Sequence, residues 1–175
     1  MIPRYSTAEM SDIWSTRNKY KLWLQIELYA CEMQEKLGVI PKNKSSAIRK
    51  LANFDENRIL EIEEKTKHDV IAFLTNVAEY VGEDAKFIHK GLTSSDILDT
   101  CFSLQLISAL DLIIKEVSEI LKVLEKKANK YKYLLCIGRS HGIHAEPVTF
   151  GFKLLTFYQE FLRNKKRLEN FIFLT

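Results

Sequence analysis

No glycine or proline interrupts the chain between Gly91 and Gly138. Since these two residue types most often end a helix, the stretch can form one helix from Ile97 to about Tyr131, roughly 50 Å long at ~1.5 Å per residue. Its apolar residues form two stripes, the first being Leu106, Leu110, Ile113, Val117, Ile120 and Leu124, and the second Ile107, Ile114, Leu121 and Ala128. A helix with two apolar stripes needs partners on more than one side, so the pattern predicts a helix bundle.

The remaining sequence also favours helix, because 175 residues include only six glycines and three prolines. Capping residues and apolar spacing predict helices over about 6–14, 17–37, 42–52, 66–81 and from 148 onward, with another after the N-cap Asp55. In the second of these the expected core stripe is Leu22, Ile26, Ala30, Met33 and Leu37. We predict an all-α fold, with a small N-terminal helical domain over 1–92 and the first long helices of a bundle domain over 93–175. We interpret the chain as the front part of a larger helical protein.

Composition argues against several classes of protein. A net charge of +3, with basic and acidic residues interspersed, does not favour nucleic-acid binding. Three scattered cysteines among apolar neighbours (Cys31, Cys101 and Cys136) are typical of reduced thiols in a cytosolic protein. No signal peptide is expected, and no apolar run of membrane-spanning length. The predicted location is therefore the cytoplasm, away from membranes.

All four histidines fall at predicted helix boundaries. His141 and His144 lie in residues 138–147, Gly-Arg-Ser-His-Gly-Ile-His-Ala-Glu-Pro, which we expect to form a loop between two helices. Imidazole titrates near neutral pH, and Glu146 could orient a ring, so the loop is a candidate for proton transfer. A metal site is the alternative, but the His-x-x-His spacing has no obvious third ligand.

Two further segments could bind an anion at the start of a helix. His68 is expected in the first turn of the helix beginning at Thr66, beside unpaired N–H groups and the positive end of the dipole. Residues 91–96, Gly-Leu-Thr-Ser-Ser-Asp, bring three hydroxyls to another helix start. The alternatives are an exposed first-turn histidine in the first case and ordinary capping in the second.

Together these segments resemble the fumarase/aspartase superfamily of β-eliminating lyases, and most closely its adenylosuccinate lyase branch. The resemblance covers Met1 to about Arg167. It rests on Arg4-Tyr5, on Lys67-His68-Asp69, on residues 91–96 and on residues 138–147. Four such segments in this order are more specific than any one of them.

The resemblance implies an all-helical homotetramer with a central bundle. It implies cleavage of a C–N bond in adenylosuccinate, to give AMP and fumarate, and of the analogous bond in SAICAR in purine biosynthesis. No metal or organic cofactor is implied. His141 matches the general acid, and His68 a second active-site histidine that binds and orients substrate. The other residues that match substrate-binding positions are Arg4, Tyr5, Lys67, Asp69, His89, Thr93, Ser94 and Ser140.

The sequence departs from the family pattern in two ways. Lys67 stands where arginine is frequent, so a forked contact becomes a point charge, and Ser95 and Ser140 replace frequent threonines. The family's general base, a serine on a downstream glycine- and serine-rich loop, has no counterpart, so we expect the chain alone to be inactive. The alternatives are another superfamily lyase, such as an argininosuccinate lyase or carboxymuconate cycloisomerase, and a non-catalytic helical scaffold.

Overall fold

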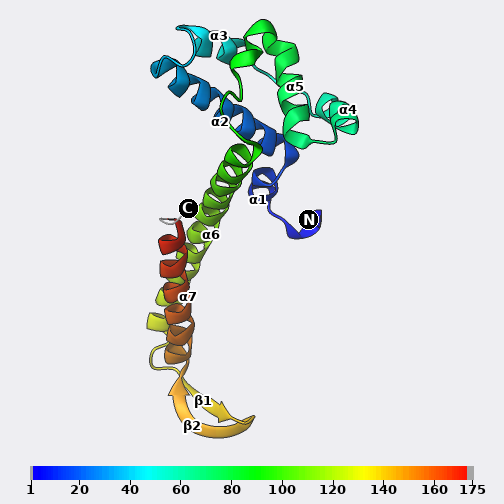
Figure 1. Ribbon diagram of the computed structural model, residues 1–175. Helices are drawn as coiled ribbons and strands as arrows, with labels where there is room; N and C mark the ends of the chain where they lie inside the picture. The colour runs from blue at the N-terminus through cyan, green and yellow to red at the C-terminus, as the bar shows by residue number, and fades with distance from the viewer. Residues whose placement is uncertain (1, 173–175) are drawn as a thin grey trace. The chain divides into compact units, whose positions relative to one another are not determined.

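The computed structural model describes residues 2–172, which belong to two compact units, Met1–Leu106 and Ile107–Thr175 (Figure 1). The described elements are η1 (Pro3–Tyr5), α1 (Ala8–Ile13), α2 (Thr16–Lys36), α3 (Lys44–Leu51), α4 (Glu56–Thr66), α5 (Asp69–Val81), η2 (Gly82–Phe87), α6 (Ser94–Lys130), β1 (Leu135–Ser140), β2 (Ile143–Thr149) and α7 (Phe150–Ile172). The all-α prediction is confirmed, with one small two-stranded sheet in addition. The domain boundary at residue 92 stays a prediction.

Aromatic side chains form the centre of the first unit. Tyr20 and Trp23 of α2 both contact Phe73 of α5, at ring-centroid distances of 5.7 and 5.4 Å. Ile97 and Cys101, in the first turns of α6, are buried in the same core. The start of the long helix is therefore fixed by packing within the first unit.

The predicted core stripe of α2 is correct in part: Leu22 and Ile26 are half-buried against the core, but the C-terminal end of the stripe is exposed. Met33 and Leu37 are 53% and 74% exposed. The residues of α2 that are buried are Tyr20, Trp23, Glu27, Leu28 and Cys31. The helix is rotated toward its large aromatic residues because these bury the most apolar area, even though this brings a glutamate inside.

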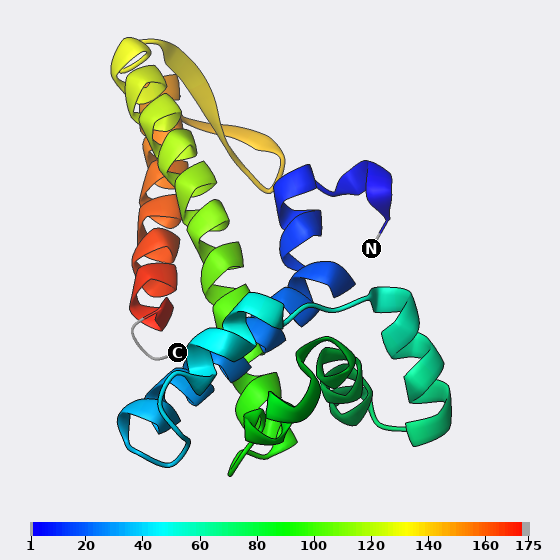
Figure 2. The same cartoon turned by 90° about the horizontal axis from the view of Figure 1, so that it is seen from above.

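In the second unit α7 lies beside α6 in both views (Figures 1 and 2). Gly151, in the first turn of α7, is buried against the end of α6, because a Cβ placed there would overlap the Ala128 carbonyl oxygen. Leu121 is buried, whereas Ile113 and Ile120 of the first predicted stripe are 41% and 39% exposed. The second predicted stripe therefore describes the buried side of this helix better than the first.

The expectation that no run reaches membrane-spanning length is wrong by length and composition, because α6 satisfies both. A single such helix is weak evidence of a membrane span. Its apolar residues instead follow the alternating three- and four-residue spacing of a bundle helix, and its start lies in a packed core.

The predicted loop over 138–147 is a β-hairpin. β1 pairs with β2 in antiparallel register, with Arg139 opposite His144 and Ser140 opposite Ile143. The two residues between them, His141 and Gly142, have φ of 53° and 78°, the positive values of a type I′ turn. His141 thus lies in a hairpin turn and His144 in a strand, so the prediction that all histidines lie at helix boundaries is wrong for both.

Candidate functional site

His141 projects from the tip of the hairpin. It is the first central residue of the turn, and its side chain is exposed. Asparagine and glycine are the usual residues at this position, because a Cβ disfavours positive φ. The hairpin therefore carries an imidazole at a turn position that asparagine or glycine usually occupies.

A hollow of about 340 Å³ lies where the hairpin meets the first turn of α7. Its lining residues are Ile137, Gly138, Arg139, Val148, Phe152 and Lys153. Arg139 and Lys153 give it two cationic side chains. Arg139 thus belongs to the same hairpin as His141 and borders this hollow.

His68 is the N-cap of α5, which begins at Asp69 and not at Thr66, so His68 lies just before the first turn and not within it. Its Nδ1 accepts a hydrogen bond from the Ile71 N–H at 3.4 Å and lies 3.5 Å from an Asp69 carboxylate oxygen. Nδ1 can accept the Ile71 N–H only when Nδ1 itself carries no proton, and it can donate to Asp69 only when it does carry one. In the capping state Nε2 carries the proton, so His68 can donate that hydrogen to a ligand.

The helix start predicted at Thr66 is wrong, because Thr66 is the last residue of α4 and its hydroxyl donates to the His68 carbonyl. Lys67 ends α4 in the left-handed conformation, with φ of 52°. The adjoining hollow, of about 540 Å³, is lined by Leu60, Glu63, Glu64 and Lys67. The charge of Lys67 therefore stands among carboxylates on this face of α4.

His89 is paired with a buried carboxylate, Glu27, that was not among the site residues predicted from the sequence. Glu27, 1% exposed, accepts the His89 main-chain N–H at 2.8 Å and lies 2.6 Å from His89 Nδ1. Burial raises the pKa of the Glu27 carboxyl, and the hydrogen bonds from His89 act in the opposite direction. A glutamate on the aromatic side of α2 was the available signal, since buried carboxylates are almost always paired.

Thr93 and Ser94 lie at the start of α6. The Asp96 carboxylate accepts the Thr93 N–H at 2.8 Å, which is one half of a capping box. The side chain that this bond shows in a capping role is that of Asp96. A negative charge at the helix start also means that an anion bound there would meet Asp96 as well as the helix dipole.

Arg4 and Tyr5 lie together in η1, with the Arg4 guanidinium 4.7 Å from the centre of the Tyr5 ring. Both side chains are exposed. The candidate residues of the first unit thus occupy four separate places: η1, the α4–α5 junction, the segment after η2 and the start of α6. Ser140 and His141 belong to the second unit.

Backbone conformation connects several of these positions. Among the residues that the structure describes, four other than glycine have positive φ: Asn43, Lys67, His89 and His141. Three of the four are candidate site residues. Left-handed conformations cost free energy for residues with a Cβ and are frequent at functional sites. At Lys67 this conformation ends α4, and at His141 it forms the hairpin turn.

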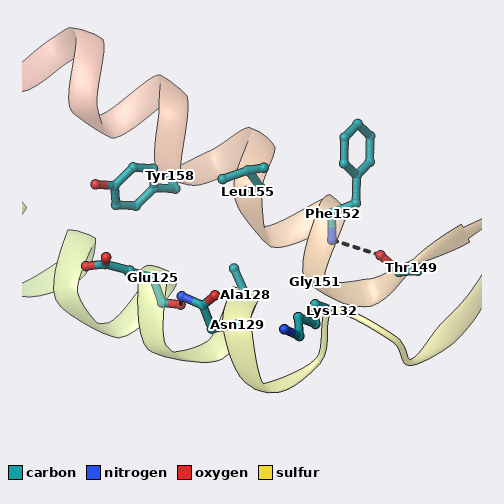
Figure 3. Close-up of a pocket in the computed structure, with 9 residues that line it drawn as sticks. All are labelled: Glu125, Ala128, Asn129, Lys132, Thr149, Gly151, Phe152, Leu155 and Tyr158. Atoms are coloured by element: carbon teal, nitrogen blue, oxygen red, sulfur yellow. Dashed lines mark hydrogen bonds between the residues drawn. The ribbon is translucent and has the colours of Figure 1, made fainter.

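A separate cavity of about 400 Å³ lies between α6 and α7 (Figure 3). The side chains of Leu155 and Tyr158 lie between the helices, whereas Phe152 points away from α6. The Phe152 N–H donates to the Thr149 hydroxyl at 3.2 Å and so caps the start of α7. The cavity contains no histidine.

Metal-binding clusters are not found in the described part of the chain: no three His, Cys, Asp or Glu side chains of residues 2–172 are grouped to hold an ion.

A family model described as lyase matches residues 4–173 of the chain. The chain belongs to this lyase family. Similar curated proteins are adenylosuccinate lyases from Synechocystis sp., 50% identical over 96% of the chain, and from Bacillus subtilis and Streptococcus mutans, each 47% identical over 97%. The chain spans 39% of the length of these relatives. The predicted resemblance is therefore confirmed.

Solved structures of the same superfamily share the fold. A fumarate lyase from Mesorhizobium sp. is 27% identical, with a TM-score of 0.87 over 92% of this chain and 39% of its own. The β-carboxy-cis,cis-muconate cycloisomerase of Acinetobacter calcoaceticus is 25% identical, with a TM-score of 0.87 over 94% of this chain and 40% of its own. These similarities extend to both units of the lyase chain.

Proposed function

We propose that this lyase cleaves the C–N bond of adenylosuccinate to give AMP and fumarate, and the analogous bond of SAICAR to give AICAR and fumarate. The observation that carries the proposal is the 47–50% identity to three adenylosuccinate lyases. The fumarate lyase and the muconate cycloisomerase are only 25–27% identical. Another specificity within the family is therefore the weaker candidate.

In such an elimination a base removes a proton from the succinyl Cβ, and the resulting electron pair forms the double bond of fumarate. The C–N bond breaks toward nitrogen, which takes a proton from an acid. We assign the acid to His141, whose exposed ring at the hairpin tip can approach a substrate. His68 is assigned a second role at the reacting end of the substrate, and its capping tautomer offers Nε2–H to an oxygen of the succinyl group.

The polyanionic substrate needs several hydrogen-bond donors and cations. We assign substrate contacts to Arg4, Tyr5, Lys67, Asp69, His89, Thr93, Ser94 and Ser140. The left-handed backbone of Lys67 and His89 supports this assignment. Neither a metal nor an organic cofactor is required by a reaction that only moves protons and breaks a C–N bond.

The assigned residues lack a base. The resemblance places it on a glycine- and serine-rich loop that these 175 residues do not contain, so we expect the chain by itself to show no turnover. We also propose that it self-associates, as a homotetramer at the length of its relatives, and that it acts in the cytoplasm. The self-association is supported by large exposed apolar residues of α6 and α7: Ile113, Ile120, Val123, Phe152 and Phe157.

The proposal is tested with a chimera in which this chain replaces the matching segment of the Bacillus subtilis enzyme. The chimera should convert adenylosuccinate, followed by absorbance, and His141→Asn should reduce kcat by about 100-fold or more. Asparagine suits the left-handed turn, so the hairpin should survive. Ile143→Val, next to the turn and without a titratable group, is the control and should retain activity.

A folded, tetrameric chimera that turns over a carboxymuconate but not adenylosuccinate would contradict the proposal and would indicate the specificity of a carboxymuconate cycloisomerase. Full activity of the His141→Asn chimera would remove His141 from the role of acid.

A further inference from the structure

The segment that follows η2 is held against one face of α2. Glu27, Cys31 and Gln34 are spaced by four and three residues and so lie on the same side of the helix. The Cys31 thiol donates to the Phe87 carbonyl at 3.4 Å, and the Gln34 amide donates to the Lys90 carbonyl. Glu27 contributes the two contacts to His89, 62 residues away in sequence. Three consecutive side chains on this face thus fix the segment.

His89 needs such support because of its backbone. Its φ of 61° is left-handed, which is unfavourable for a residue with a Cβ. The hydrogen bond from its main-chain N–H to Glu27 stabilises that conformation, and the Leu92 N–H donates to the His89 carbonyl at 3.3 Å. The direction of the ring is therefore determined by main-chain and side-chain contacts together.

Each oxygen of the Glu27 carboxylate contacts a different nitrogen of His89. Oε2 accepts the main-chain N–H, and Oε1 lies 2.6 Å from Nδ1. When Glu27 is ionised its carboxylate can only accept, so Nδ1 then carries a proton. This makes Nε2 the ring nitrogen that can meet a ligand, and the His89 side chain is 22% exposed.

We propose that Glu27 is a positioning residue for substrate binding: it fixes both the ring direction and the Nδ1–H tautomer of His89, so that Nε2 faces the substrate. The role in substrate binding rests on the proposed function. The tautomer does not, because it follows from the geometry of the free chain.

The substitution Glu27→Gln tests the tautomer directly. The main-chain N–H of His89 is always a donor, so the oxygen of the introduced amide must face it, and the NH₂ group of that amide then faces Nδ1. An NH₂ group can only donate. Glu27→Gln should therefore move the proton from Nδ1 to Nε2 while the shape of the side chain is nearly unchanged.

The measurement is a long-range ¹H–¹⁵N correlation spectrum of the full 175-residue chain, labelled at histidine, at a pH where imidazole is neutral. Wild-type His89 should show the Nδ1–H tautomer and Glu27→Gln the Nε2–H tautomer. Glu32→Gln, on the same helix and paired with Arg49 instead, should leave it unchanged. An Nε2–H tautomer in the wild type would overturn the proposal even if Glu27→Gln failed to fold.

The functional consequence is measured in the chimera. Glu27→Gln should raise KM for adenylosuccinate by about tenfold or more, with a smaller change in kcat. Losses of about this size are typical when a residue that orients a ligand-binding histidine through a hydrogen bond is replaced. Glu32→Gln should stay within about twofold of the wild type. An unchanged KM in an active chimera would overturn the role in binding. An inactive chimera with the expected tautomers would instead count against the proposed function.

Discussion

Gly151 lies against the main chain of Ala128, at a separation that leaves no room for a side chain on residue 151. A Cβ on Gly151 would overlap the Ala128 carbonyl oxygen and would lie 2.7 Å from the main chain of Lys132. The neighbours are backbone atoms, which cannot move aside as a flexible side chain can. The start of α7 and the end of α6 can therefore meet here only because residue 151 is glycine.

Gly151→Ala should consequently destabilise the second unit. Relieving the overlap requires the two helices to separate, and overpacking of this kind typically costs about 1–3 kcal/mol. Urea unfolding followed by circular dichroism measures the change. Gln159→Ala, at an exposed position of the same helix, is the control and should change stability little. Equal stability of both variants would show that the close approach does not contribute.

The ionisation of Glu35 should make the free energy of unfolding depend on pH in the acidic range. Its carboxylate accepts the main-chain N–H groups of Asn43 and Ser45 at 3.0 and 2.7 Å, at the start of α3. Hydrogen bonds from Ser45 lower the pKa of Glu35 below its ordinary value of 4.5. A pKa lowered by folding stabilises the folded state above the unfolded pKa, and this contribution is lost as pH falls through the folded pKa.

The melting temperature should therefore fall as the pH is lowered below 4.5, the ordinary pKa of a glutamate, and Glu35→Gln should reduce that fall. At neutral pH Glu35→Gln should lower the melting temperature by roughly a few degrees, since a helix cap is weakened. Calorimetry at several pH values measures both effects. Glu64→Gln, on the exposed surface of α4, provides the comparison. An identical acid dependence in the two variants would contradict the role of Glu35.

Cys31 should resist alkylation while the chain is folded. Burial raises the pKa of its thiol to about 11, so very little reactive thiolate exists near neutral pH. Cys136, half-buried in β1, should react first. Mass spectrometry after brief exposure to iodoacetamide, with and without urea, gives the order. Labelling of Cys31 at the rate of Cys136 in the folded chain would show that burial does not protect it.

The turn at His141 should discriminate between side chains by their tolerance of positive φ. Asparagine adopts this region readily, whereas a β-branched residue there is strongly disfavoured. His141→Val should reduce the hydrogen-exchange protection of the hairpin amides by roughly tenfold, and His141→Asn should preserve it. Equal protection in the two variants would mean that the turn tolerates both residues.

The sequence allowed much of the helical architecture to be predicted, because caps and breakers are local signals. Asp55 caps α4 as expected, with its carboxylate accepting the Arg58 N–H at 2.8 Å. The rotation of α2 could not be predicted, because it depends on packing against Phe73, which is distant in the sequence. Its burial of Glu27 could not be deduced from α2 alone either, since the partner is His89.

The candidate site shows the same division. That His141, His68 and His89 are candidate site residues was evident from their types and their neighbours in the sequence. How each is held was not. The hairpin under His141 arises from strand pairing between 135–140 and 143–149, which glycine and proline at 138 and 147 obscured. Similarly, the tautomer of His68 depends on a cap that forms only once Lys67 has ended α4.

The left-handed backbone at Lys67, His89 and His141 has a consequence for protein engineering. Glycine or asparagine would relieve the conformational cost at each of the three positions, so a selection for heat resistance alone should accumulate such replacements there. On the roles proposed above, a selection that also demands turnover of the full-length enzyme or chimera should reject them. The proposed function thus predicts that heat resistance and activity favour different residues at these three positions.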